Sequence, residues 1–399
     1  MKFVVVMYLF FYFTYASGQL STKDAMAQMK AEFAVMKSSH QNEFQTYKNE
    51  LDKTYNSYKK QLEAYWKNPQ LSTKKTWVSY SKDKKSRSTV DFENNTIIVE
   101  AIAKTKEKAN KEIKERLSYA ISKNTREVIK TDPLQKKVAE ISKTNSVVNS
   151  KMDATPILST VLFNKTPTKK ELANYTSNIL NTKKIKQEES KDKEKHLYKL
   201  VVHLPKNTNL KRSQIYKNDV VKNSENFKIP FSLIFAIIQT ESNFNPFAKS
   251  HVPAFGLMQI VPNTAGKDTY RFLYKHNGIP SVPYLYNSKK NIEMGSAYLY
   301  ILYYRYLKKI KDPTSRLYCT IAAYNTGAGN IAWAFTNKYN MNKAAPIINS
   351  MKSDEVYNHL LNNLRFDEPK HYLRRVKRRM KIYEKNYTFQ QGIVNLIKG

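Results

Sequence analysis

The stretch from Ile229 to Ser242, IPFSLIFAIIQTES, constrains the fold more than any other part of the chain. Between Phe231 and Ile238 it is apolar on nearly every side, and Pro230 suits the first turn of a helix. A helix without a polar face has to be covered on all sides by other elements. We therefore predict a buried central helix surrounded by further helices.

The segments that follow this helix support an all-helical second half. Residues 291–310, 316–335 and 369–387 each read as a helix, and none shows the alternating pattern of a strand. The single cysteine, Cys319, lies in an apolar helical context and is expected to be a small buried hydrophobe.

The first half has a different pattern. Between Leu20 and Trp66, apolar residues recur at spacings of three and four, which places them on one face of a long helix. These residues are Phe44, Tyr47, Leu51, Tyr55, Tyr58, Leu62 and Tyr65. The face is expected to pack against the rest of this half rather than against a membrane or a partner helix.

Strand patterns follow the long helix. Short runs around Trp77, Val90 and Ile97 predict three strands, and YKLVVHLP predicts a further strand ending at Pro205. Charged stretches at 101–130 and 134–143 predict helices, and the polar stretch at 183–195 predicts an exposed loop.

The predicted fold class is therefore α+β overall. A small α+β domain, residues 19–205, without a recognisable catalytic cluster, precedes an all-α domain, residues 206–399.

The N-terminus and the charge together predict an envelope protein. Residues 1–18 contain one Lys, an apolar run and a small-residue site, which is typical of a cleaved secretory signal peptide, although an uncleaved anchor is an alternative. Lys and Arg number 68 against 33 Asp and Glu, giving a net charge of +35, which attracts polyanions. Export excludes nucleic acid as the partner and leaves the polymers of the cell envelope.

Glu241 is the candidate catalytic residue of the predicted central helix. Apolar surroundings and the negative end of a helix dipole both favour a protonated carboxyl, which can donate to a glycosidic oxygen. The alternative is a glutamate at a helix end that simply reaches water. No other acidic residue follows until Asp268, although most enzymes that cleave sugar chains use two carboxylates.

Further polar and glycine-containing segments follow Glu241. The segment AFGLMQ brings a glycine, which permits close approach of the backbone to a ligand, and Gln259, which can donate to and accept from sugar groups. The segment AAYNTGAG adds Tyr324 and Asn325 before a bend.

Taken together, these segments resemble a known family. The blocks ESNFNPFAKSHVPAFGLMQIVPNTA, NIEMGSAYLYILYYRYL, AAYNTGAGNI and EPKHYLRRV are similar to the lytic transglycosylase domain related to goose-type lysozyme. The segment WVSYSKDKKSRSTVDFENNTIIVE further resembles the accessory domain of membrane-bound lytic murein transglycosylase C. The resemblance covers roughly residues 40 to 390.

This resemblance implies a lysozyme-like fold that cleaves the β-1,4 bond between N-acetylmuramic acid and N-acetylglucosamine, without a metal or another cofactor. It makes Glu241 the acid and then the base, and Tyr372 the residue that orients its carboxyl group. Ser250, Met258, Gln259, Tyr324 and Asn325 correspond to residues that bind the sugar. The expected partners are peptidoglycan strands and possible other cell-wall enzymes, not nucleic acid.

Alternatives remain open for the anchoring and for the function. Gln19 stands where C-type members carry a lipid-bearing cysteine, so the sequence leaves membrane association open and does not predict a lipid anchor. A lysozyme-type hydrolase with Asp268 or Glu293 as the base is a second reading of the site. An inactive wall-binding protein is a third.

Overall fold

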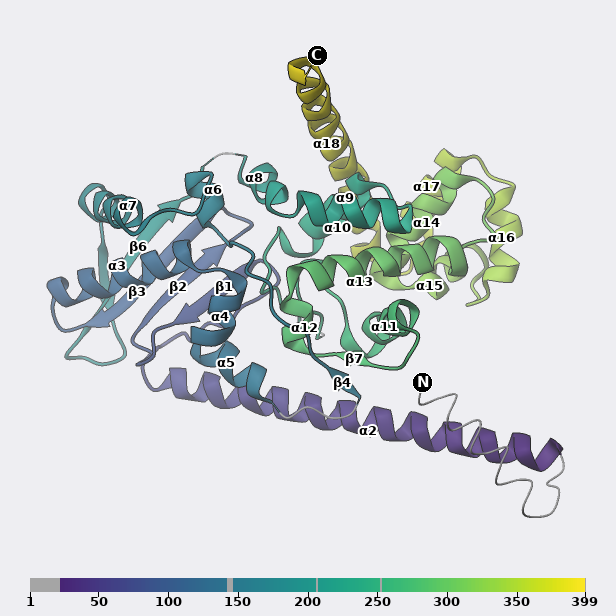
Figure 1. Cartoon of the computed structure of the whole chain (residues 1–399), viewed down its shortest axis with the longest axis horizontal. Coiled ribbons are helices and arrows are strands. Elements are labelled where there is room, and N and C mark those ends of the chain that lie inside the picture. The colour runs from purple at the N-terminus through teal and green to yellow at the C-terminus, as the bar shows by residue number, and fades with distance from the viewer. Residues whose placement is uncertain (1–21, 142–145, 206, 252, 399) are drawn as a thin grey trace.

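An antiparallel five-stranded sheet forms the centre of the N-terminal half in the computed structural model, which describes residues 22–141, 146–205, 207–251 and 253–398 (Figure 1). The strand order is β1 (Thr76–Tyr80), β2 (Ser86–Asp91), β3 (Thr96–Ala103), β6 (His196–His203) and β5 (Lys186–Glu189). Aromatic and β-branched residues pair across it, with Trp77 opposite Val90 and Val90 opposite Ile97. The predicted signal peptide, residues 1–18, lies outside the described residues.

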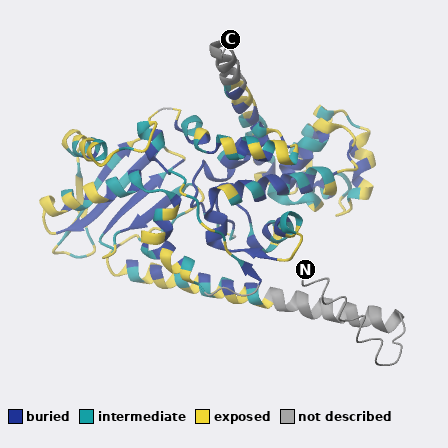
Figure 2. Ribbon diagram, viewed as in Figure 1, coloured by how far each residue is buried: buried dark blue, intermediate teal, exposed yellow. Residues whose placement is uncertain are grey.

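The long helix predicted at the N-terminus is α2 (Thr22–Glu63). Its buried stripe consists of Phe44, Tyr47, Leu51, Tyr55, Tyr58 and Leu62, and Figure 2 shows this stripe between exposed positions. Tyr65 was wrongly assigned to the stripe. It lies beyond the end of the helix and is 37% exposed, because the chain turns after Glu63.

The remaining elements of the N-terminal half are short. They are α3 (Lys106–Ser122), α4 (Thr125–Thr131), α5 (Pro133–Glu140), β4 (Val147–Val148), α6 (Ser159–Phe163) and α7 (Lys169–Thr182). The helix predicted from 101 begins later, because β3 continues to Ala103, and it divides at Asn124, which caps α4. The predicted loop at 183–195 contains the exposed edge strand β5, because its backbone pairs with β6.

Helix α10 (Phe231–Ser242) is the buried central helix of the C-terminal half. Only Phe231 and Gln239 are partly exposed, which confirms the prediction from its apolar pattern. Helices α9 (Lys217–Phe227), α13 (Ser288–Ile301) and α18 (Asp367–Lys398) pack against it. Phe235 of α10 stacks on Tyr383 and Tyr387 of α18, with ring centroids 5.1 and 4.8 Å apart.

Mostly short helices and one two-residue strand complete this half. They are α8 (Thr208–Ile215), η1 (Pro262–Gly266), α11 (Lys267–Tyr274), β7 (Ile279–Pro280), α12 (Val282–Tyr286), η2 (Leu302–Tyr306), α14 (Pro313–Thr326), α15 (Ala328–Thr336), α16 (Met341–Asn349) and α17 (Ser353–Asn363). Cys319 on α14 is fully buried, as predicted. The fold class is confirmed as α+β, with a sheet-containing first half and a helical second half.

The two halves are joined by several direct contacts. Strands β4 and β7 pair in parallel, with Val147 opposite Ile279. The Trp77 ring stacks on Phe247 at 5.7 Å, and the buried Arg212 guanidinium donates to the Phe92 carbonyl at 2.8 Å. These contacts bring the start of β1 next to the end of α10. The division at residues 205 and 206 stays a prediction.

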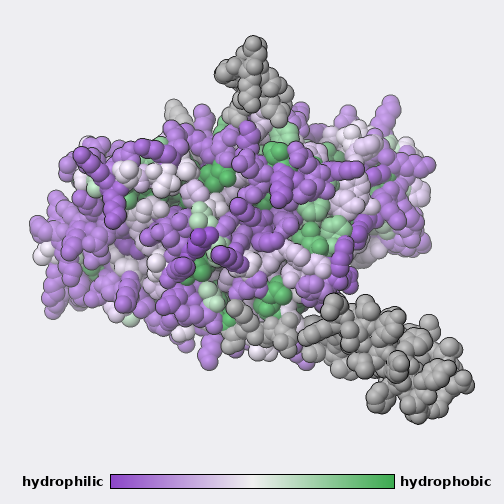
Figure 3. All heavy atoms as spheres, in the orientation of Figure 1, coloured by the Kyte–Doolittle hydropathy of each residue, from purple (hydrophilic) through white to green (hydrophobic). Residues whose placement is uncertain are grey.

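The surface is strongly hydrophilic. On the face in Figure 3, hydrophobic residues appear only as small separate patches. Within the described ranges, no helix has the length and apolarity needed to cross a membrane.

Candidate active site

Glu241 lies in the last turn of α10 and is only 6% exposed. The helix ends at Asn243, whose left-handed backbone (φ 50°) caps it through its N–H to the Gln239 carbonyl. The Ser242 hydroxyl bonds to the carbonyls of Ile238 and Leu257, at 3.0 and 2.8 Å. The end of the helix is thereby tied to the turn that contains Gly256 and Gln259.

The surroundings of Glu241 favour its protonated form. Burial is the largest influence and raises the pKa of this carboxyl group, to which the charge of Glu368 adds. The Lys74 ammonium, the Tyr372 hydroxyl and Lys75 act in the opposite direction without cancelling the rise in pKa. A carboxyl group with a raised pKa is suited to proton donation near neutral pH.

A buried tyrosine, Tyr372, and a partly buried one, Tyr324, lie beside this carboxyl group. Tyr372 of α18 is 1% exposed, and its hydroxyl faces Glu241 but forms no hydrogen bond of regular geometry with the described residues. The Tyr324 hydroxyl of α14 donates to the Met258 carbonyl at 2.8 Å. Burial and then the charge of Glu241 raise the pKa of both phenols. Both hydroxyls therefore remain protonated and can act as donors.

The turn at 256–259 is shaped by two left-handed residues, Gly256 (φ 77°) and Gln259 (φ 50°). The Gln259 amide donates to the carbonyls of Ala248 and Gly256, at 3.1 and 3.0 Å, while its own oxygen is buried without a partner among the described residues. The Met258 N–H donates to Asn291 at 2.7 Å, and the Met258 side chain is fully buried. These bonds hold the turn in place, and the buried Gln259 oxygen has no donor among the described residues.

The other two predicted residues lie on flanking segments. The Ser250 hydroxyl accepts from the Ala254 N–H at 3.1 Å and shapes the loop after α10. Asn325 is half-buried in the last turn of α14, directly after Tyr324. The structure therefore groups Glu241, Tyr372 and Tyr324, while sugar binding by the predicted residues stays a prediction.

The N-terminal half contributes residues that sequence reasoning missed. Lys74 Nζ lies 3.5 Å from Glu241 Oε2. Lys75 Nζ donates to the carbonyls of Gln239 and Thr240, at 3.3 and 2.7 Å, and so caps the C-terminal end of α10. Burial and then Arg379 lower the pKa of Lys75 to about 8. No local pattern distinguishes these two lysines in so basic a chain.

Glu293 and Asp268, the candidate bases of the hydrolase alternative, have different neighbours from Glu241. Glu293 Oε2 is paired with Lys290 at 2.8 Å and accepts from the Tyr274 hydroxyl at 3.3 Å. Asp268 lies in the first turn of α11. The structure therefore gives Glu293 partners that are separate from Glu241.

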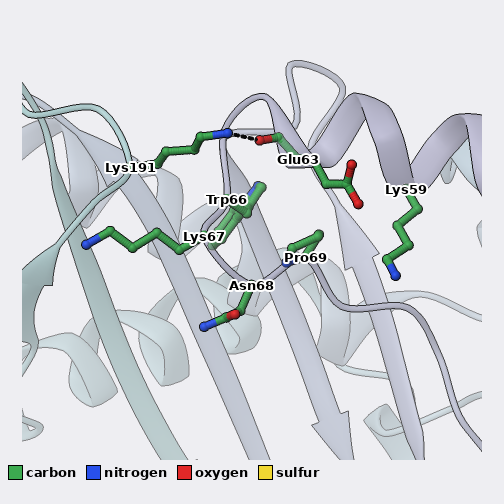
Figure 4. A pocket seen from close by; sticks show the side chains of 7 residues that line it. All are labelled: Lys59, Glu63, Trp66, Lys67, Asn68, Pro69 and Lys191. Atoms are coloured by element: carbon green, nitrogen blue, oxygen red, sulfur yellow. Dashed lines mark hydrogen bonds between the residues drawn. The ribbon is translucent and has the colours of Figure 1, made fainter.

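A hollow of about 590 Å³ lies at the end of α2, away from this site (Figure 4). Its lining residues are Lys59, Glu63, Trp66, Lys67, Asn68, Pro69 and Lys191. Lys191 bonds to the Glu63 carbonyl, and Lys67 pairs with Glu189 at 3.3 Å. None of the predicted site residues lines it.

The raised pKa of Glu241 predicts a pH-dependent stability. A carboxyl group whose pKa is raised on folding contributes stability below its unfolded pKa, and that stability is lost as pH rises through the folded pKa. We expect Glu241→Gln to gain stability relative to wild type as pH rises from roughly 4 to roughly 8, because only the wild-type side chain loses a proton as pH rises. Urea unfolding of both proteins across this range measures it, and a constant difference would contradict the assignment.

The family model and two relatives that match this chain are all transglycosylases by name. The family model "Transglycosylase SLT domain" matches residues 220–347. Membrane-bound lytic murein transglycosylase C of Serratia proteamaculans is 35% identical over 315 residues, which is 78% of this chain and 83% of the relative. The protein of the same name from Klebsiella pneumoniae strain 342 is 34% identical over 319 residues, 79% of this chain and 83% of the relative. The crystal structure of the 70 kDa soluble lytic transglycosylase of Escherichia coli is 25% identical, with a TM-score of 0.34, over 43% of this chain and 24% of that one.

Proposed function

From the premise that this chain belongs to the family of membrane-bound lytic murein transglycosylase C, we propose that it cleaves peptidoglycan strands with Glu241 as acid and then base. The bond broken is the β-1,4 linkage between N-acetylmuramic acid and N-acetylglucosamine. The observation that carries this role is a carboxyl group 6% exposed, at the end of a buried helix, with its pKa raised by burial.

In the first step, protonated Glu241 gives its proton to the glycosidic oxygen as the bond from that oxygen to C1 breaks. The N-acetylglucosamine side leaves as an alcohol. The 2-acetamido carbonyl of the muramic acid stabilises the positive charge that develops at C1, so the substrate replaces a second carboxylate. The buried hydroxyl of Tyr372, which faces the carboxyl group, is proposed to orient it.

In the second step, the Glu241 carboxylate takes the proton of the C6 hydroxyl of the same muramic acid. The C6 oxygen then bonds to C1 and closes a 1,6-anhydro ring, and Glu241 is protonated again for the next cycle. Water is not consumed. General acid–base catalysis of this kind contributes about 10²–10⁴ in rate.

The sugar is proposed to lie against the segments that flank the two tyrosines. Gln259 is proposed to shape this surface through the turn that its amide group holds in place. Ser250, Met258, Tyr324 and Asn325 are proposed to shape the surface around it, Met258 through packing because its side chain is fully buried.

We also place the protein in the cell envelope, exported to the periplasm. The relatives are named membrane-bound, and the net charge of +35 suits a polymer that carries free carboxylates. Mass spectrometry of the mature N-terminus tests this, with cleavage after Gly18 as the expected result. A chain that keeps its N-terminal methionine and remains in the cytoplasm would refute it. Contact with other cell-wall enzymes remains a proposal of the same kind.

Digestion of purified peptidoglycan distinguishes this function from wall binding alone. We expect the wild-type protein to release soluble muropeptides, measured by chromatography. Binding to the insoluble polymer without any release would instead indicate an inactive wall-binding protein.

A further inference from the structure

The segment between α2 and β1 connects the N-terminal half to the proposed catalytic acid. Lys74 lies in this segment, and its Nζ is 3.5 Å from Glu241 Oε2. The Glu241 side chain is 8% exposed and that of Lys74 is 45% exposed. A cation from one half of the molecule thus contacts a carboxyl group that the other half buries.

The backbone around Lys74 is held in place by the C-terminal half. The fully buried Asn245 uses its Nδ2 to bond to the carbonyls of Thr73 and Thr76, at 3.3 and 3.2 Å. The Lys249 N–H donates to the same Thr73 carbonyl at 3.3 Å. The position of Lys74 is therefore set by fixed contacts and not by the reach of its side chain alone.

The neighbouring lysine has a separate task. Lys75 bonds to the last carbonyls of α10 and offsets the negative end of the helix dipole. The Arg379 guanidinium donates to the Thr240 hydroxyl at 2.8 Å on the same helix end. Of these cations, Lys74 is the one paired directly with the Glu241 carboxylate.

We propose that Lys74 is a positioning residue for Glu241, whose ammonium holds and stabilises the carboxylate formed when Glu241 gives up its proton. This inference rests on the proposed role of Glu241. It makes the N-terminal half a part of the active site and not only an accessory to it. The first step creates the carboxylate and the second consumes it, so its stability affects both.

The charged and titratable groups around Glu241 come from three segments. They are Lys74 and Lys75 before β1, Tyr324 on α14, and Glu368, Tyr372 and Arg379 on α18. Glu368 pairs with Arg375 at 3.2 Å, which limits its effect on Glu241. Removal of the Lys74 side chain leaves the tyrosines and Lys75 in place, so a shift in the pKa of Glu241 can be assigned to the charge of Lys74.

The test is the pH profile of muropeptide release by Lys74→Met, with Lys74→Arg and Lys82→Met alongside. Loss of the cation raises the pKa of Glu241, so the protonated acid persists to higher pH and the alkaline limb of kcat/KM moves upward. We expect kcat at the plateau to fall about fivefold, the size typical of an ion pair with a half-exposed partner. Lys74→Arg should retain the wild-type limb, as should Lys82→Met, which removes an exposed charge from the same half.

A stability cycle provides a readout that does not depend on activity. At about pH 7, Glu241→Gln should stabilise the Lys74→Met protein more than it stabilises the wild type. In the Lys74→Met protein the buried Glu241 carboxylate has no cation beside it at residue 74, so its replacement removes a larger cost. An active wild type whose alkaline limb is unchanged in Lys74→Met, or a cycle with no coupling, would overturn the proposal. A wild type that releases no muropeptides contradicts the proposed function itself, so the two failures are distinct.

Discussion

Glu241→Gln is expected to lower kcat for peptidoglycan cleavage about 10²–10⁴-fold while the protein remains folded. Glutamine keeps the shape of the side chain but has no proton to give to the glycosidic oxygen and cannot remove one from the C6 hydroxyl. Glutamine needs no new space in this buried position and carries no charge, so we expect the fold to be retained. Release of soluble muropeptides under single-turnover conditions measures the rate, and circular dichroism checks the fold.

The matched controls are Glu293→Gln and Asp268→Asn. Glu293 is paired with Lys290, and Asp268 lies in the first turn of α11, so neither change should affect proton transfer by Glu241. If either control loses as much rate as Glu241→Gln, a water-activating base is present and the hydrolase reading holds. If Glu241→Gln keeps the wild-type rate, Glu241 is not the acid.

Gly256→Ala is expected to have the largest effect on stability among the glycine substitutions near the site. A Cβ at this position would overlap the Leu285 carbonyl and the Asn291 side chain, and the backbone has φ 77°. Overlap of this kind costs about 1–3 kcal/mol, in addition to the strain of a side chain at positive φ. We expect the free energy of unfolding to fall by about 2–5 kcal/mol in urea titrations.

Gly327→Ala is the control for an added Cβ that meets no neighbouring atom. Gly327 also has a positive φ, of 86°, but an added Cβ would meet nothing within 4 Å. Gly327→Ala should therefore show the backbone strain without the overlap. Its free energy of unfolding should fall by about 1–3 kcal/mol less than that of Gly256→Ala. Equal losses in the two variants would show that the turn relaxes freely around residue 256.

The parts of the fold that depend on local pattern could be predicted from the sequence. The buried helix α10 follows from its uniformly apolar run, and the buried face of α2 follows from spacings of three and four. Tyr65 continues that spacing but lies past the end of the helix, because periodicity does not indicate where a helix stops. The exposed strand β5 has no apolar pattern and exists through pairing with β6.

The site was predictable only in part. Glu241 and Tyr372 follow from their sequence blocks, and the structure brings them together. The contribution of Lys74 and Lys75 depends on contacts between segments more than 160 positions apart, as between Lys75 and Thr240. With 68 Lys and Arg in the chain, nothing local separates these lysines from the many at the surface. Hydrogen bonds from Asn245 and Lys249 to the Thr73 carbonyl hold the segment with these two lysines beside the end of α10.

In the proposed reaction, Glu241 serves as both acid and base and no water is consumed. Digestion of purified peptidoglycan in isotopically labelled water, followed by mass spectrometry of the muropeptides, tests it most directly. The mechanism predicts 1,6-anhydromuramic acid ends that carry no label, formed by wild type and lost in Glu241→Gln. Reducing ends that carry the label would contradict it.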